Sequence, residues 1–186
     1  MPKQKQPTQI LLGPVPPALI GCGKDEESNI ITLAWVGVVN SSPPMITAAV
    51  RPNRYSHDII RKTGEFTVNL ARADQAGLAD GCGTRSGRDM DKFEHFNLTA
   101  VRGTLRQAPM IEECPISMEC RVERLVELES HTVFFANVVA TYVDPAVTDE
   151  KGRIDFERCR LLGFCAGSYL DTAPLNLSIG YTVKEK

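Results

Sequence analysis

The sequence predicts a mainly β protein, a closed or nearly closed antiparallel barrel with short α-helices in its connections. Segments rich in β-branched and aromatic residues outnumber those with helical periodicity. The helical segments are short, whereas a parallel α/β sheet needs a long crossover helix after each strand. No repeat, low-complexity tract or linker divides the 186 residues, so residues 1–186 are expected to form a single domain.

Composition and charge exclude several functional classes. Apolar residues make up 42% of the chain and charged residues 24%, which excludes disordered, collagen-like and disulfide-scaffold proteins. The formal charge of −2 gives no electrostatic reason to expect nucleic acid or an anionic membrane as partner. The first residues lack the apolar run of a signal peptide, and the apolar stretch at 33–39 is far shorter than the ~20 residues that span a bilayer. We therefore expect a soluble, cytoplasmic protein.

Six cysteines raise the question of metals and disulfides. No two are spaced as Cys-x-x-Cys and none has a histidine at ligand spacing, so no metal site is predicted. Disulfides are disfavoured in a reducing compartment. We expect most of the cysteines to be small buried apolar residues.

Prolines and polar clusters divide the first 52 residues into elements. Residues 10–20 are expected to form an extended lead-in because prolines interrupt them. Residues 30–39 have the apolar and β-branched density of a strand buried on both faces, and the Asn-Ser-Ser-Pro-Pro run after them ends it. Residues 45–50 form a second strand candidate that ends before Pro52.

A helix–strand pair follows. The apolar spacing predicts a short helix over 55–63, with Asn53 or Ser56 as its N-cap and Gly64 in the left-handed position at its end. Residues 65–70 alternate apolar and polar side chains, which is typical of a half-buried strand.

The middle of the chain contains a glycine-rich basic segment. A second short helix is expected over 74–80, followed by a flexible loop over 81–88. That loop, with Lys92, could form one wall of an anion site, although a solvated loop is the better interpretation of the loop alone. No glycine-rich fingerprint of a dinucleotide fold or a P-loop is complete.

The second half consists mostly of strands. Apolar residues alternate from Ile116 and change phase near Leu125, as at a β-bulge. A nearly continuous apolar strand is predicted over 132–142. Residues 160–164 fit either a last short strand or a turn of helix.

The segment 51–56 is a candidate anion site. It follows a strand directly and brings two guanidinium groups, an amide and two hydroxyls to the start of the predicted helix. Free backbone N–H groups at a helix N-terminus together with arginines suit a phosphate. A capped helix with solvated arginines explains the same residues equally well.

Aromatic and imidazole side chains supply the other candidates. Trp35 is the only tryptophan and lies in the run expected to be buried, where it is either core or a wall for a planar aromatic ligand. His131 opens an apolar strand, a position more typical of a structural histidine than of a catalyst. His57 and His95 are expected on the surface, and no catalytic triad can be assigned.

Taken in order, these segments resemble the flavin reductase-like FMN-binding domain, and within that family the flavoredoxin branch. The resemblance covers about residues 8–170 and lies in the runs 29–35, 41–45, 51–56, 64–70, 86–93, 119–122 and 130–132.

This resemblance implies a Greek-key FMN-binding split barrel, a homodimer, and FMN held non-covalently near the subunit interface. Positions that match the FMN surroundings of flavoredoxin-like proteins are Asn29, Trp35, Ser56, Lys92, His131 and Phe164. The resemblance places further residues at the phosphate or the ribityl chain, namely Arg51, Asn53, Tyr55, Ser41 and Ser42.

The catalytic candidates under this resemblance are Lys92 and His131. A cation such as Lys92 near the flavin ring would favour the anionic reduced flavin and raise its potential. His131 would either hydrogen-bond a ring oxygen or help to place a nicotinamide.

The expected function is that of an oxidoreductase in which NAD(P)H reduces bound FMN, which passes electrons to free flavin, a ferric complex or an electron-transfer protein. A non-enzymatic FMN-binding electron carrier or flavin store is the alternative. A ligand-free barrel that serves as an interaction domain is a third possibility.

Overall fold

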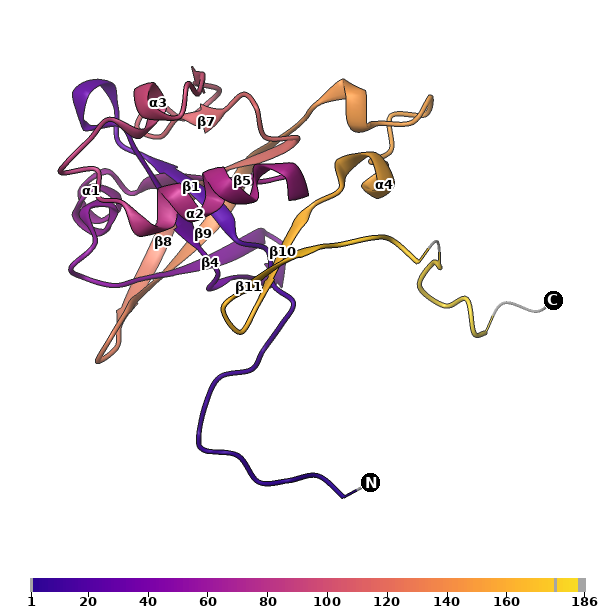
Figure 1. Ribbon diagram of the computed structural model, residues 1–186. Helices are drawn as coiled ribbons and strands as arrows, with labels where there is room; N and C mark the ends of the chain where they lie inside the picture. The colour runs from indigo at the N-terminus through magenta and orange to yellow at the C-terminus, as the bar shows by residue number, and fades with distance from the viewer. Residues whose placement is uncertain (1, 176, 184–186) are drawn as a thin grey trace.

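A curled antiparallel sheet forms the centre of the molecule in the computed structural model, which describes residues 2–175 and 177–183. The sheet has seven strands in the order β2-β1-β5-β8-β9-β4-β3. Their bounds are β1 (Ala18–Cys22), β2 (Asn29–Leu33), β3 (Val36–Ser41), β4 (Pro44–Val50), β5 (Glu65–Leu70), β8 (Ile116–Glu127) and β9 (Thr132–Val143). The predicted mainly β, antiparallel barrel class is confirmed (Figure 1).

Short helices and two small hairpins lie in the connections. The helices are α1 (Tyr55–Thr63), α2 (Ala76–Thr84), α3 (Lys92–His95) and α4 (Phe156–Cys159), with 3-10 turns at Asp25–Glu27, Ala73–Gln75 and Pro145–Val147. The remaining strands pair with each other as β6 (Ala100–Val101) with β7 (Met110–Ile111), and β10 (Leu162–Cys165) with β11 (Ser168–Asp171). Residues 160–164 therefore enter a strand and not a helix.

The inner face of the sheet packs against α1 and forms the main core. This core contains Ile20, Phe66 and Phe134, all fully buried, and Ile60 from the helix. The predicted bounds of α1 and β5 are correct. Gly64 ends the helix at φ 67° and its N–H donates to the carbonyl of Ile60 over 2.9 Å, as the sequence indicated.

The prediction that β5 is half-buried was wrong, because its outer face is covered as well. Thr67 and Asn69 are fully buried there. The hydroxyl of Thr67 donates to the carbonyl of Pro109 over 2.6 Å, and the amide of Asn69 donates to Leu19 over 2.9 Å. A second core beneath α2 and α3 covers this face. Polar alternation in β5 therefore reflects buried hydrogen bonds and not solvent.

The expected single strand over 30–39 is divided in two. Ala34 and Trp35 lie between β2 and β3, and β3 is the exposed edge strand of the sheet. Trp35 is 47% exposed and Val38 82% exposed. An apolar run does not distinguish a core strand from an apolar edge, because both exclude charged residues.

The glycine-rich segment is partly helical. Helix α2 continues to Thr84, whereas a helix over 74–80 and a flexible loop were expected. Gly81 allows this because the ring of Phe96 packs against its backbone, and an added Cβ would lie 2.8 Å from Phe96 Cε1. The glycine permits a close approach and does not mark a loop.

The long β8–β9 hairpin contains the expected irregularity. Its register shifts between Val122 and Arg124, close to the predicted phase change at Leu125, and again between Glu119 and Cys120. The cysteines follow the prediction too, since five are buried and all six are free thiols.

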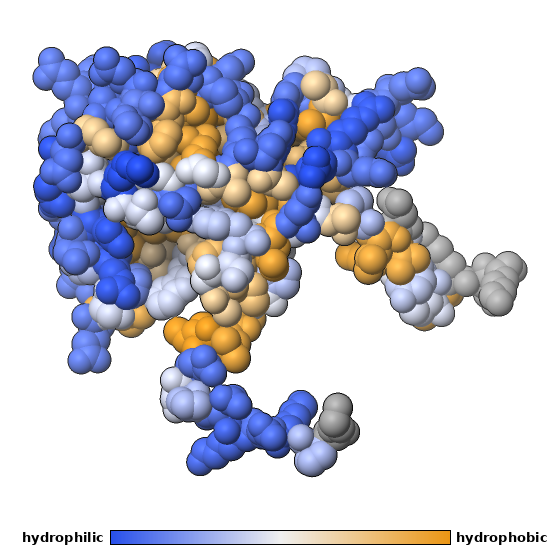
Figure 2. Space-filling model, in the orientation of Figure 1, coloured by the Kyte–Doolittle hydropathy of each residue, from blue (hydrophilic) through white to orange (hydrophobic). Residues whose placement is uncertain are grey.

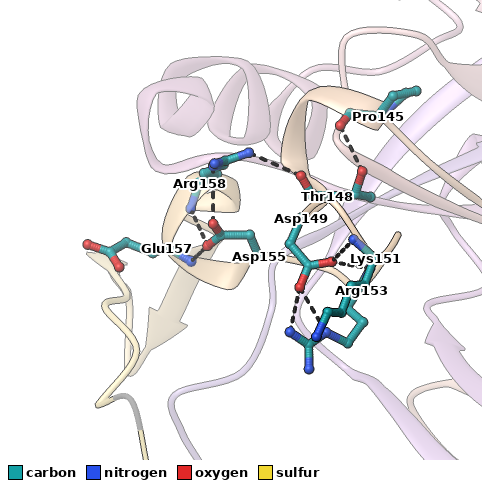
Figure 3. Close-up of polar contacts among 8 residues, drawn as sticks. All are labelled: Pro145, Thr148, Asp149, Lys151, Arg153, Asp155, Glu157 and Arg158. Atoms are coloured by element: carbon teal, nitrogen blue, oxygen red, sulfur yellow. Dashed lines mark hydrogen bonds and ion pairs between the residues drawn. The ribbon is translucent and has the colours of Figure 1, made fainter.

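The segment between β9 and β10 is held by its own polar contacts, as Figure 3 shows. The carboxylate of Asp149 accepts from the backbone of Lys151 and from the guanidinium of Arg153, the latter over 2.8 Å. Asp155 caps α4, and Arg158 donates to the carbonyl of Thr148 over 3.0 Å. This segment folds locally and adds a small third core against β8.

Both terminal segments extend away from the body (Figure 1). Each exposes apolar side chains, such as Leu12 in the first and Ile179 in the second, and Figure 2 shows hydrophobic residues on both. No helix among residues 2–175 and 177–183 is long and apolar enough to cross a membrane.

Candidate functional site

A pocket of about 240 Å³ lies where β2, the start of α1 and the α2–α3 connection meet, and we call it the anion pocket. Its walls are Asn29, Ile31, Asn53, Arg54, Tyr55, Ser56, Gly83, Arg85, Ser86, Gly87, Arg88 and Lys92. Four of these side chains are basic and none is acidic. The electrostatics of the pocket therefore select a negatively charged group.

The start of α1 supplies polar groups to this pocket. No side chain caps the helix, whose N-cap is Arg54, so neither Asn53 nor Ser56 has the capping role expected from the sequence. The buried hydroxyl of Ser56 instead accepts from the amide of Asn29 over 2.8 Å, and this bond joins β2 to the first turn of α1. The uncapped helix N-terminus leaves backbone N–H groups for an anion.

Lys92 is the most unusual group of the anion pocket. Its side chain is 2% exposed, and its Nζ donates to the carbonyls of Ile30 and Cys82, each over 2.7 Å. No carboxylate of the described residues forms an ion pair with it. An ammonium group has three donors, so one N–H is left for a ligand.

The thiols near Lys92 do not neutralise its charge. Burial raises the pKa of Cys22 to about 12 and that of Cys82 to about 11, so both stay protonated at neutral pH. Burial also lowers the pKa of Lys92, with a smaller contribution from Arg54, because a charged ammonium is costly without a counter-ion. A bound anion would supply that counter-ion.

The basic loop after α2 contributes two arginines to the pocket, whereas the sequence favoured a solvated loop. The guanidinium of Arg88 lies 5.3 Å from the ring centroid of Tyr55 and donates weakly to the carbonyl of Asn53. The guanidinium of Arg85 lies 5.9 Å from the ring of Phe96. The signal in the sequence was the clustering of Arg85 and Arg88 around Ser86 and Gly87, but only the fold brings them to α1.

A second, apolar pocket of about 460 Å³ lies at the far end of β2. We call it the apolar pocket, and its walls are Ile10, Leu12, Val15, Ala34, Trp35, Val36, Gly37, Thr47, Ala49, Val133, Phe164 and Ala166. Trp35 and Phe164 thus face one space, as the sequence analysis expected. The ring of Phe164 is held edge-on by Tyr169 at 5.5 Å, within the β10–β11 hairpin.

His131 packs against Trp35 and does not itself line this pocket. The two rings have centroids 4.4 Å apart, and Nδ1 of His131 lies 2.9 Å from the hydroxyl of Ser130. Burial lowers the pKa of His131, and the positive charge of Arg51 lowers it further. The imidazole is therefore neutral at physiological pH. Arg51 lies near His131 and does not line the anion pocket.

The remaining predicted residues either line the anion pocket or lie outside both pockets. The anion pocket is lined by Asn29, Asn53, Tyr55, Ser56 and Lys92, so Lys92 and Trp35 line different pockets. Ser41 is the exposed last residue of β3, Ser42 lies in the exposed turn before β4, and neither lines either pocket.

Strand β2 connects the two pockets. Asn29 and Ile31 line the anion pocket, and Ala34 and Trp35 line the apolar pocket directly after the strand ends. At roughly 3.3 Å per residue, the five steps from Asn29 to Ala34 span about 16 Å. The two pockets therefore lie at the two ends of one strand. No group of three or more His, Cys, Asp or Glu in the described part of the chain is placed to bind a metal.

Comparison with known proteins finds relatives along nearly the whole chain. Residues 13–172 match the model of the flavin reductase like domain. An uncharacterized protein of Archaeoglobus fulgidus is 32% identical over 132 residues, which cover 71% of this chain and 75% of that protein. The flavoredoxin of Desulfovibrio vulgaris (Miyazaki F) superposes with a TM-score of 0.91 at 26% identity, covering 98% of this chain and 100% of that one.

The flavoredoxin from Methanosarcina acetivorans superposes with a TM-score of 0.87 at 28% identity, and the match covers 99% of this chain and 100% of that one. Fold and site therefore define a split-barrel protein with a basic pocket and an aromatic pocket joined along one strand. The chain belongs to the flavin reductase-like domain family, which confirms the resemblance found in its sequence.

Proposed function

We propose that this protein is an FMN-binding oxidoreductase of the flavin reductase and flavoredoxin type. The observation that carries the proposal is Lys92, a buried ammonium that has no carboxylate partner in the described part of the chain and lines a pocket together with three arginines. A phosphate group carries the negative charge that this pocket is missing. The anion pocket would hold the phosphate of FMN through Ser56, Lys92 and the start of α1.

The apolar pocket fits the other end of the same ligand. Trp35 and Phe164 would form a dry wall for the isoalloxazine ring, and Asn29 would contact the part of the ligand between ring and phosphate. His131, neutral and held by Ser130, can exchange a hydrogen bond with a ring oxygen or with a bound nicotinamide. When bound, FMN supplies hydride acceptance from NAD(P)H and onward transfer of electrons to free flavin, a ferric complex or an electron-transfer protein.

Names of relatives support this proposal. Among proteins of the same fold, one from Streptomyces globisporus is named an NADH:FAD oxidoreductase, and one from Thermus thermophilus is named an FMN-binding protein. We further propose a homodimer, because the outer edge of the sheet exposes Val38 and Val39 together with Trp35. The six free thiols fit a reducing cytoplasm.

Two measurements test the proposal. The absorption spectrum of the freshly purified protein, or of protein mixed with FMN, should show a bound flavin. Anaerobic stopped-flow mixing with NADH and with NADPH should then bleach the flavin faster than free FMN is bleached. A protein that neither carries FMN nor quenches its fluorescence contradicts flavin binding, and bound flavin without acceleration identifies an electron carrier or flavin store instead of an enzyme.

A further inference from the structure

His57 is a buried histidine that the sequence analysis had expected on the surface. It lies in the first turn of α1, is 4% exposed, and packs edge-on against Phe134 with ring centroids 5.7 Å apart. Both ring nitrogens have partners. Nδ1 lies 2.9 Å from a carboxylate oxygen of Asp58, and Nε2 lies 2.9 Å from the hydroxyl of Thr132.

The chemistry of the partners defines the direction of both bonds. An ionised carboxylate only accepts, so Nδ1 carries the hydrogen that is donated to Asp58. In the neutral ring Nε2 is then an acceptor, and the hydroxyl of Thr132 donates to it. His57 is thus held in one orientation inside the core by a partner at each ring nitrogen.

The two ends of the His57–Thr132 bond adjoin different pockets. His57 follows Ser56, which lines the anion pocket, and Thr132 follows His131, which stacks on Trp35 at the apolar pocket. Thr132 is 2% exposed, so water does not compete for the bond. One buried hydrogen bond between side chains therefore joins the first turn of α1 to the start of β9.

We propose that His57 is a positioning residue that couples the two pockets. An anion held at Ser56 restrains the first turn of α1, and the bond to Thr132 carries this restraint to His131 and so to the ring that Trp35 presents. Occupation of either pocket then raises the affinity of the other, because a coupling free energy is reciprocal. This inference rests on the proposed flavin site, and it predicts that phosphate and flavin ring bind cooperatively even when they are separate molecules.

Riboflavin and inorganic phosphate provide those separate molecules. The dissociation constant of riboflavin is measured by fluorescence quenching, with saturating phosphate and with chloride of equal ionic strength. In the wild-type protein we expect phosphate to tighten riboflavin binding about five- to tenfold, within the usual range of such couplings. In Thr132→Val, which keeps the shape but loses the hydroxyl, the ratio should fall to about one, and Thr132→Ser should restore it.

A merely structural role would change riboflavin affinity in Thr132→Val without changing the ratio, and that result overturns the inference. A ratio of one in a wild-type protein that binds both riboflavin and FMN overturns it as well. Failure of the wild-type protein to bind either flavin contradicts the proposed function itself and the inference with it.

A second measurement needs no variant. Addition of inorganic phosphate to the wild-type protein should shift the imidazole proton resonances of both His57 and His131. Shifts at His57 alone mean that the restraint ends in α1, and they overturn the proposed coupling.

Discussion

The indole of Trp35 stacks on the imidazole of His131, with ring centroids 4.4 Å apart and ring planes tilted by 33°. Trp35 is 47% exposed, yet this contact and the edge of β3 hold it in place. One face of the indole is therefore occupied by His131, and the residue still lines the apolar pocket. The tryptophan is not part of the core, and under the proposed function its free face would pack against the flavin ring.

Replacement of Trp35 by alanine should weaken flavin binding about tenfold. Aromatic pairs contribute roughly 0.5–1.5 kcal/mol beyond the area that they bury, and the smaller side chain also enlarges the pocket. The measurement is titration of FMN fluorescence, with Trp35→Phe as a control that should keep most of the affinity. An unchanged dissociation constant for Trp35→Ala would mean that the flavin ring does not pack against Trp35.

Replacement of Ser56 by alanine should weaken FMN more than riboflavin, which lacks the phosphate. A hydrogen bond to a charged group contributes about 1.5–3 kcal/mol, so the loss for FMN should be about ten- to a hundredfold. Ser41→Ala is the matched control, since Ser41 lines neither pocket. Equal losses for both ligands in Ser56→Ala would place the phosphate elsewhere, and a large loss in Ser41→Ala would show a ribityl contact made by the β3–β4 turn.

Arg51→Gln should raise the pKa of His131, which burial and the charge of Arg51 hold below the ordinary value of 6.5. The unfolded chain binds this proton more readily than the folded one, so stability falls as the pH drops below about 6.5 and is fully present above it. Arg51→Gln should therefore reduce the loss of folding stability at low pH. An NMR titration of the His131 ring protons measures the shift directly, and an equal titration in both proteins would show that burial alone sets the pKa.

Gly87→Ala should close the anion pocket. A Cβ there would lie 2.6 Å from Cγ of Asn29 and 2.8 Å from the ring of Tyr55, so the Asn29–Ser56 bond would have to move. We expect FMN binding to fall by at least tenfold. Gly77→Ala is the control, because apart from the backbone of its own helix and its chain neighbours no described atom lies within 4 Å of the added Cβ, and the change should stabilise α2 by about 0.5–1 kcal/mol. Retention of affinity in Gly87→Ala would argue against phosphate in this pocket.

Local signals in the sequence were sufficient for some elements and not for others. The bounds of α1 and β5 were predicted correctly because apolar spacing and Gly64 report on backbone geometry that depends only on near neighbours. The break at Trp35 was missed, since an apolar run looks the same whether it faces a core or an exposed edge.

Some residues of the candidate site could likewise be predicted from the sequence, and others could not. Ser56 and Lys92 were expected from the resemblance, and the structure does bring them into one pocket. Arg85 enters that pocket only through the path of α2, and His57 is buried only because β9 lies against α1. Neither placement could be predicted from the spacing of residues along the chain, because each depends on segments that meet only in the folded protein.

Phe164 reaches the apolar pocket on the β10–β11 hairpin, outside the seven-stranded sheet, and a bridge to Val15 fastens it there. The base of the hairpin is tied to the body of the molecule, because Leu162 is buried in the second core and its N–H donates to the carbonyl of Ala71 over 2.9 Å. A change at the tip of this hairpin that keeps Leu162 in the second core would reshape one wall of the apolar pocket and leave the seven-stranded sheet as it is.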